Sequence, residues 1–140
     1  MVGGTIAQNG WRDDLPMTTA YFSHPDCRAH DMGRGHPECP ARLDAIEDHL
    51  LATGLDVALT RFEAPLARRE DLALAHTSGY VSELSDLLKR VADSGERCNL
   101  DPDTSANPAT FVAALRAAGA AVAATDAVID GAAENAFCAV

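Results

Sequence analysis

Apolar residues recur every three or four positions in three long segments, which is the spacing typical of amphipathic helices. The segments are residues 40–54, 77–95 and 110–130. Proline suits the first turn of a helix, threonine or serine can cap one, and glycine after the last turn often ends one. Pro40 and Gly54 bracket the first segment, and Gly95 follows the second. The pattern therefore predicts three helices with defined ends, and one or two further helical turns over residues 69–76.

The third helix contains a glycine in its interior. Gly119 costs about 1 kcal/mol relative to alanine at such a position, so we expect another backbone to pass close to it. The helix should be buried between other elements. We expect its apolar side to consist of Phe111, Leu115, Ala118, Val122 and Ile129, widened by several alanines.

Short runs rich in β-branched, aromatic and other apolar residues predict strands at residues 18–23, 57–62 and 135–140, the last of them buried. Helices separate these strands, which favours an α/β fold with a parallel sheet, mostly helical in this segment. Such sheets normally have more strands, so the architecture is expected to be incomplete. Residues 26–39 and 98–108 are predicted to be loops, because glycine, proline, asparagine and aspartate interrupt both.

The length of 140 residues corresponds to one domain. We expect residues 1–17 to be a loosely ordered leader and residues 18–140 to form the domain. Much of the apolar content is alanine and only 5% of the residues are aromatic, which predicts a thin core.

The formal net charge of −10 argues against binding to nucleic acid or to an anionic membrane surface. It would accommodate a cationic partner, but the favoured interpretation is that the acidity keeps the protein in solution. The uncharged apolar run at residues 117–125 is far shorter than the roughly 20 residues that span a bilayer. No signal peptide is recognisable, and the four cysteines form no CxxC pair. We therefore expect a cytoplasmic protein with reduced thiols and no membrane partner.

Two loops carry candidate chemistry. Cys27, His30, His36 and Cys39 have spacings that zinc accepts, but an unliganded loop is the favoured interpretation of these residues. Asp101 and Asp103 could act as paired acids or calcium ligands, or one of them could brace its own loop through an Asx-type hydrogen bond.

Five motifs occur in an order that is typical of one known protein family. They are HPECPARL at residues 36–43, AHTSGYV at 75–81, LDPDT at 100–104 with NP at 107–108, AALRAAGA at 113–120 and NAFCAV at 135–140. Together they resemble the N-terminal part of the histone deacetylase family, specifically its class II-like and bacterial amidohydrolase branch. The resemblance runs from about Tyr21 to Val140.

The resemblance implies an arginase/deacetylase-type α/β fold and zinc-dependent removal of acetyl groups from lysine or polyamine amines. In the family, an Arg-Pro-Pro-Gly-His-His motif with the catalytic histidines follows the strand that corresponds to 136–140, and the zinc ligands come later still. We therefore expect no zinc bound to this chain and no catalytic residue in it. The expected protein is an inactive N-terminal fragment of a deacetylase; the alternative is a stand-alone, non-catalytic binding module.

The resemblance also implies roles for individual residues. Asp103 matches an aspartate that binds substrate amides at the active-site rim, with Asp101 as the alternative if the register shifts by two. His36 and Pro37 match the loop that shapes the tunnel mouth. Arg42 resembles an arginine of an internal channel beneath the zinc, suited to acetate, and Tyr21 resembles an aromatic residue of that channel. The alternative for Arg42 is a surface ion pair with a residue four positions away.

Overall fold

The structure is a computed structural model that describes residues 19–140. The predicted leader at residues 1–17 lies outside the described residues. Three parallel strands form a sheet in the order β2-β1-β5: β1 is Thr19–Ser23, β2 is Leu59–Glu63 and β5 is Asn135–Ala139. In the register, Tyr21 of β1 lies between Arg61 of β2 and Phe137 of β5. The expected α/β class with a parallel sheet is therefore confirmed.

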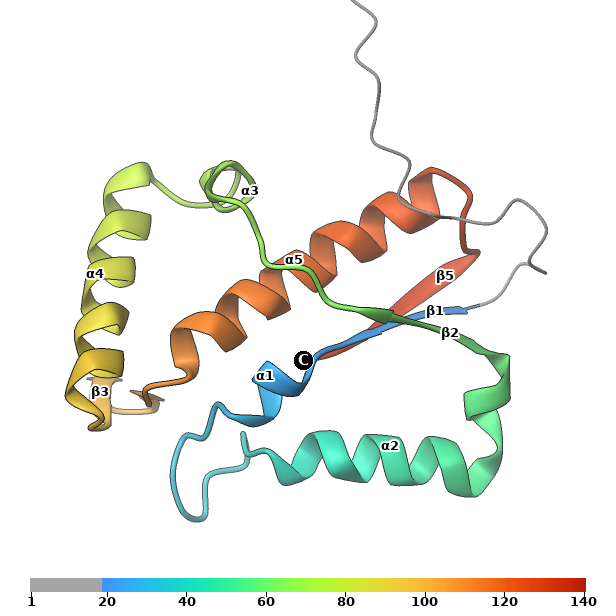
Figure 1. Cartoon of the computed structure of the whole chain (residues 1–140), viewed down its shortest axis with the longest axis horizontal. Helices are drawn as coiled ribbons and strands as arrows, with labels where there is room; N and C mark the ends of the chain where they lie inside the picture. Colours follow the sequence, from blue (N-terminus) through green and yellow to red (C-terminus); the bar gives the residue numbers. More distant parts are fainter. Residues whose placement is uncertain (1–18) are drawn as a thin grey trace, which may run out of the picture.

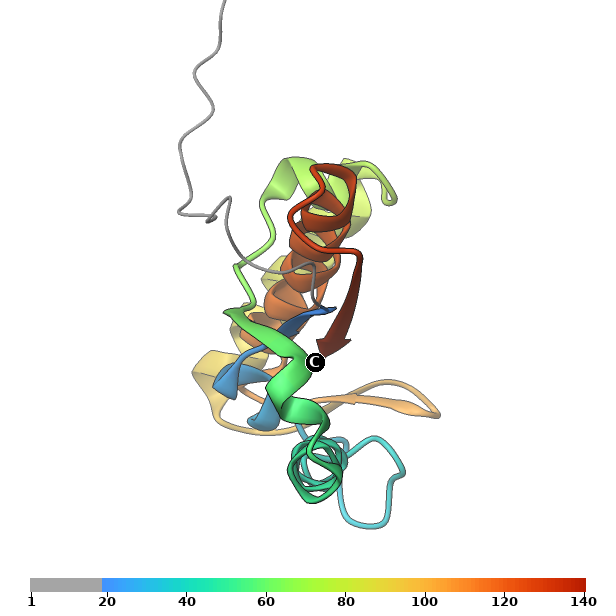
Figure 2. The ribbon, with the colours of Figure 1, turned by 90° about the vertical axis from the view of Figure 1, so that its right-hand side faces the viewer.

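Two helices cover opposite faces of this sheet (Figures 1 and 2). Helix α5 (Thr110–Ile129) packs on the face that carries Ala20 and Phe22, and helix α2 (Ala41–Thr53) packs on the face that carries Tyr21. The alternation follows from strand geometry, because successive side chains point to opposite sides. Gly54 ends α2 with a φ of 71°, as its position after the last turn predicted.

Helix α5 buries mainly small residues, and the predicted apolar side was right only in part: Ile129 is exposed, and the other four named residues are half-buried, namely Phe111, Leu115, Ala118 and Val122. Its buried residues are Ala113, Gly119, Ala120, Ala124 and Ala127, whereas Ile129 is 76% exposed. The reason is a close backbone approach: a Cβ built on Gly119 would lie 2.0 Å from the Pro65 carbonyl oxygen. In the same segment, which connects β2 to α3, the Ala67 N–H donates to the Leu115 carbonyl at 2.9 Å. The expected close neighbour of Gly119 is thus confirmed.

By length and composition α5 could cross a membrane. Core helices of folded domains pass the same test, and α5 packs along the sheet as such a helix does. It also carries Arg116, whose guanidinium pairs with Asp26 at 3.0 Å and donates to the Ala64 carbonyl at 2.8 Å.

The remaining elements correct several boundaries. Residues 26–39 are not entirely loop, because Pro25–Arg28 forms the single-turn helix α1, and β2 starts later than expected because Leu55–Ala58 forms the 3₁₀ turn η1. Residues 98–108 are not irregular: Cys98–Asp101 (β3) and Thr104–Ala106 (β4) pair as an antiparallel hairpin. Their prolines, Pro102 and Pro108, fall outside the paired strands, so neither removes an N–H donor from the pairing.

Helices α3 (Arg69–Ala73) and α4 (Ser78–Ser94) occupy the segments where helical turns were expected, and the Thr77 side chain caps α4. The strand at residues 135–139 is less buried than predicted, because no described strand pairs with its outer edge; Phe137 is 48% exposed. The thin core is confirmed: among the described residues, Tyr21 is the one large side chain with under 2% exposure.

Candidate functional site

The candidate site lies beyond the carboxyl end of β1, on the edge where open α/β sheets usually bind ligands. Strand β1 leads through α1 into residues 29–40, and this loop lies beside the β3–β4 hairpin (Figure 1). We call residues 29–40 and 98–106 together the rim. A cavity of about 410 Å³ lies between the two segments and is lined by residues of both, including His36, Pro37 and Asp103.

The fold brings two of the predicted rim residues together. His36 Nε2 lies 3.6 Å from Asp103 Oδ1, which is an ion-pair separation longer than a direct hydrogen bond. The His36 side chain is 27% exposed and that of Asp103 is 97% exposed. Pro37 follows His36 in the same cavity wall. The Asp103 carboxylate therefore faces solvent at the mouth of this cavity.

Asp101 and Asp103 have different surroundings. Asp101 Oδ1 accepts a hydrogen bond from the Asp103 main-chain N–H at 2.8 Å, and this bond holds the pKa of Asp101 below its ordinary value. Asp101 thus braces the hairpin turn in the Asx-type manner considered above. The carboxylate of Asp103 takes no part in that hydrogen bond and is 97% exposed.

Side chains that sequence reasoning missed hold the two rim segments together. The Arg97 guanidinium pairs with the Asp31 carboxylate at 3.2 Å and also donates to the Asp31 carbonyl. Asn107 Nδ2 donates to the Ala29 carbonyl at 2.8 Å. Nothing in the local pattern could identify these pairs, because their members are far apart in the sequence.

Arg42 lies deeper, at the start of α2. Its Nη2 donates to Glu38 Oε1 at 2.9 Å and to the Val140 main-chain oxygen at 2.7 Å, while its Nε is buried without a hydrogen-bond partner. The pair with Glu38 is the i,i+4 interaction considered as an alternative. Arg42 also lines two cavities of about 550 and 340 Å³, the first shared with Tyr21. The surface-pair alternative and a position on a cavity wall therefore both hold.

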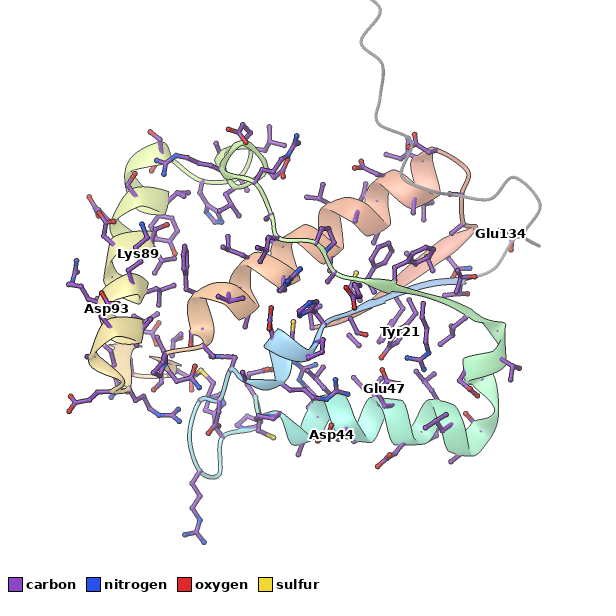
Figure 3. The ribbon with its side chains drawn as sticks, in the orientation of Figure 1. Tyr21, Asp44, Glu47, Lys89, Asp93 and Glu134 are labelled. Atoms are coloured by element: carbon purple, nitrogen blue, oxygen red, sulfur yellow. The ribbon has the colours of Figure 1, made fainter. Side chains whose placement is uncertain are left out.

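Tyr21 is the centre of a partly buried polar contact between the sheet and α2. Its side chain is 1% exposed, and its hydroxyl donates to Glu47 Oε1 at 2.6 Å. The Arg61 guanidinium lies 4.7 Å from the ring centroid and pairs with Glu47 Oε2 at 2.9 Å. Burial, reinforced by the Glu47 carboxylate, raises the pKa of Tyr21 to about 12. Figure 3 shows Tyr21 and Glu47 together in the space between β1 and α2.

Sequence reasoning missed Glu47 and Arg61. A signal for Glu47 was present, since it lies four residues after the buried Leu43 and therefore on the helix face that meets the sheet. The hydrogen bond from Arg61 holds the pKa of Glu47 below its ordinary value.

The structure does not assemble a zinc site from Cys27, His30, His36 and Cys39. Cys27 is 8% exposed among apolar side chains, and burial raises the pKa of its thiol, which disfavours the thiolate that binds metal. His30 Nδ1 contacts Thr110 Oγ1 at 2.9 Å. Within residues 19–140 no group of three or more His, Cys, Asp or Glu residues could hold a metal ion. Among the described residues, these four side chains therefore do not form a zinc site.

The sequence matches the family described as Histone deacetylase domain over residues 36–140. The chain therefore belongs to the histone deacetylase family, as its motifs indicated. It is 36% identical over 126 residues to the human protein named polyamine deacetylase HDAC10, an alignment that covers 85% of this chain and 18% of the relative. It is 34% identical over 103 residues to a histone deacetylase-like amidohydrolase of Pseudomonas aeruginosa, covering 74% of this chain and 26% of the relative.

The fold is similar to the crystal structure titled HDA15 HD domain. The TM-score is 0.77 and the identity 26%, with 89% of this chain and 35% of that chain covered. The family and its fold are therefore confirmed, while the chain spans only about a fifth to a quarter of the two curated relatives. The roles of Asp103, His36, Pro37, Arg42 and Tyr21 stay predictions.

Proposed function

We propose that the chain is the N-terminal part of a zinc-dependent deacetylase that hydrolyses an acetylated amine, either acetyl-lysine or an acetylpolyamine, to the free amine and acetate. Family membership supports this, as do the names of the relatives, one a polyamine deacetylase and one an amidohydrolase. The chain contributes the substrate rim and part of an internal channel.

The observation that carries the proposal is the meeting of His36 and Asp103 across two distant segments, beyond the carboxyl end of β1. An exposed carboxylate at a cavity mouth accepts hydrogen bonds from the N–H groups of a substrate. It also attracts the cationic amines of a polyamine, consistent with the net charge of −10. Asp103 therefore binds and orients the acetylated amine at the rim.

Arg42 and Tyr21 serve the acetate product. A guanidinium suits a carboxylate, and the Arg42 Nε–H has no hydrogen-bond partner within the described residues. Tyr21 lines the same cavity of about 550 Å³ and is a neutral phenol at physiological pH, as an ordinary tyrosine is; its raised pKa of about 12 keeps it neutral in moderately alkaline solution as well. Arg42 thus supplies a cation for acetate, and Tyr21 adds no negative charge to the wall of the same cavity.

Zinc, when bound, polarises the amide carbonyl and activates water in such hydrolysis. We place the zinc ligands outside this chain, because in the family that the motifs resemble they follow the segment that corresponds to residues 136–140. No catalytic step is assigned to the residues of this chain.

The test compares the protein expressed from the whole gene with the 140-residue chain. We expect zinc-dependent acetate release from an acetyl-lysine peptide or N-acetylspermidine by the former and none by the latter. Zinc-dependent hydrolysis by the chain alone would overturn the placement of the ligands. Binding of these probes by the chain, with a gene that encodes nothing beyond Val140, would instead establish the stand-alone binding module.

Asp103→Ala tests the rim directly. Loss of hydrogen bonds to a charged group should raise KM about ten- to hundredfold with little change in kcat. Glu134→Ala is the matched control: Glu134 is an exposed carboxylate that precedes β5, at the opposite end of the sheet (Figure 3). An unchanged KM for Asp103→Ala would remove Asp103 from the substrate site.

A further inference from the structure

We propose that His36 is a positioning residue that orients the Asp103 carboxylate through its Nε2–H. This inference rests on the proposed role of Asp103 at the rim. It assigns His36 a defined task there, beyond shaping the cavity wall.

The tautomer of His36 follows from its neighbours. The Glu38 main-chain N–H donates to His36 Nδ1 at 3.0 Å, and an N–H group can only donate. The Glu38 carbonyl, the competing partner of Nδ1, is farther away at 3.4 Å. Nδ1 is therefore the acceptor, and the proton of the neutral ring is on Nε2, the atom that faces Asp103.

The Asp103 side chain depends on this contact for its orientation. The Asp103 main chain is fixed, because its N–H is bound by Asp101 Oδ1 at 2.8 Å. Its carboxylate, by contrast, is 97% exposed and forms an ion-pair contact with the His36 side chain. At 3.6 Å the contact biases the carboxylate without occupying an oxygen in a direct hydrogen bond, so both oxygens remain available to substrate N–H groups.

The separation of the two residues is set by the fold of the rim. The Arg97–Asp31 pair at 3.2 Å and the Asn107–Ala29 hydrogen bond at 2.8 Å hold the loop beside the hairpin. The His36 side chain, 27% exposed, is the less exposed partner. The rim contacts thus fix the position of His36, and His36 in turn orients the more exposed Asp103 carboxylate.

Two substitutions separate the two contacts of His36. In His36→Asn the side-chain oxygen can replace Nδ1 as acceptor of the Glu38 N–H, but the side chain is too short to reach Asp103. In His36→Gln the amide nitrogen can replace Nε2 as donor to Asp103. If His36 positions Asp103, His36→Asn impairs function and His36→Gln restores it. If His36 only braces its own loop, His36→Gln impairs function and His36→Asn preserves it.

The kinetic experiment uses the zinc-loaded protein from the whole gene and an acetyl-lysine peptide. Releasing one side chain costs enough to raise KM about three- to tenfold in His36→Asn, with kcat unchanged. His36→Gln should return KM to within about twofold of the wild type. In an Asp103→Ala background, His36→Asn should have no further effect on KM. His76→Asn, an exposed histidine before α4, is the control.

A second measurement needs no activity. Nitrogen NMR of the protein expressed from the whole gene should show the neutral His36 ring with its proton on Nε2, and Asp103→Asn should shift the Nε2 signal but not the Nδ1 signal. A proton on Nδ1 in the wild-type protein overturns the inference, and this measurement does not depend on any variant. An Nε2 signal that Asp103→Asn leaves unchanged also overturns it.

The outcomes separate the two proposals. If Asp103→Ala leaves KM unchanged, the rim function fails and the inference fails with it. If Asp103→Ala raises KM but His36→Asn raises it further by the same factor in both backgrounds, the rim function stands and only the role of His36 is overturned.

Discussion

The rim and the packed layers beneath it are stabilised in different ways. The rim joins a loop to a hairpin through exposed polar pairs such as Arg97–Asp31, and the Asp103 carboxylate is 97% exposed. The packed layers, by which we mean the sheet with α2 and α5, bury Tyr21, Phe22 and a row of alanines. Substitutions in the rim should therefore change ligand binding with little effect on folding, and substitutions in the packed layers should do the reverse.

The chemistry of the two regions explains this contrast. Exposed ion pairs contribute little to stability because water and salt screen them, but they can still fix the separation of two loops. The interior of the packed layers is close-packed, so adding or removing even one methyl or methylene group changes the free energy of unfolding. The predictions below test this contrast, beginning with the largest effect.

Gly119→Ala should be the most destabilising single change. The added Cβ would lie 2.0 Å from the Pro65 carbonyl oxygen and 2.8 Å from the Ala67 main-chain nitrogen. Both obstacles are backbone and cannot rotate away, so we expect a loss of about 3 kcal/mol in the free energy of unfolding. Chemical denaturation measures this loss.

Gly79→Ala is the matched control for Gly119→Ala. Gly79 also lies in a helix, α4, but a Cβ there meets nothing within 4 Å. Because alanine favours helix, this substitution should leave stability unchanged or raise it by less than about 1 kcal/mol. Equal effects at the two glycines would contradict the close approach between α5 and the connection after β2.

Tyr21→Phe should cost about 1–2 kcal/mol at neutral pH, because it removes the hydrogen bond to the Glu47 carboxylate. Tyr80→Phe is the control, since Tyr80 is 51% exposed. The effect should be visible as a lower denaturation midpoint in the first variant and not in the second.

The same hydroxyl predicts a dependence on alkaline pH. The pKa of Tyr21 is raised to about 12 in the folded chain, above the value of about 10 for an unfolded tyrosine. The stabilisation is therefore complete below pH 10 or so and is lost as the pH rises towards 12. A Tyr80→Phe variant, which keeps Tyr21 as the one tyrosine, isolates this titration by tyrosinate absorbance. Ionisation near the unfolded value while the chain stays folded would contradict it.

Glu47→Gln tests the acidic side of the same contact, with a smaller effect of about 1 kcal/mol at neutral pH. The pKa of Glu47 is held below its ordinary value, chiefly by the hydrogen bond from Arg61. Its contribution is therefore present above the unfolded pKa of about 4.3 and is lost as the pH falls through the depressed folded value. The difference between wild type and variant should vanish at low pH. Asp48→Asn, an exposed neighbour on α2, should show no such difference.

These sites also show what the sequence could predict. Helical periodicity with Pro40, Gly54 and Gly95 located α2 and α4, because helix ends and spacing are local properties. The buried side of α5 was predicted only in part, because residue size as well as hydrophobicity decides which residues fit beneath the crossing backbone at Pro65. Gly119 was the one local sign of that crossing.

The candidate site was predictable only in part. The motifs pointed to His36 and Asp103, and the fold places them 3.6 Å apart. The Arg97–Asp31 pair and the Glu47–Arg61 pair follow from tertiary packing, which one sequence does not encode in any local spacing. The β3–β4 hairpin was missed because its strands are short and polar, so no alternating apolar pattern marks them.

Arg97→Met should give the smallest change in stability and is the sharpest test of the contrast. Methionine keeps the aliphatic part of the side chain and removes the contacts with the Asp31 carboxylate and carbonyl. Because this pair is exposed, the unfolding midpoint should not change. Amide hydrogen exchange should nevertheless become faster at Gly33 and Ser105, whose N–H groups are held within the rim, and not at β1. If exchange in β1 accelerated equally, the rim and the packed layers would open as one unit, and the division between a region that positions ligands and a region that maintains the fold would fail.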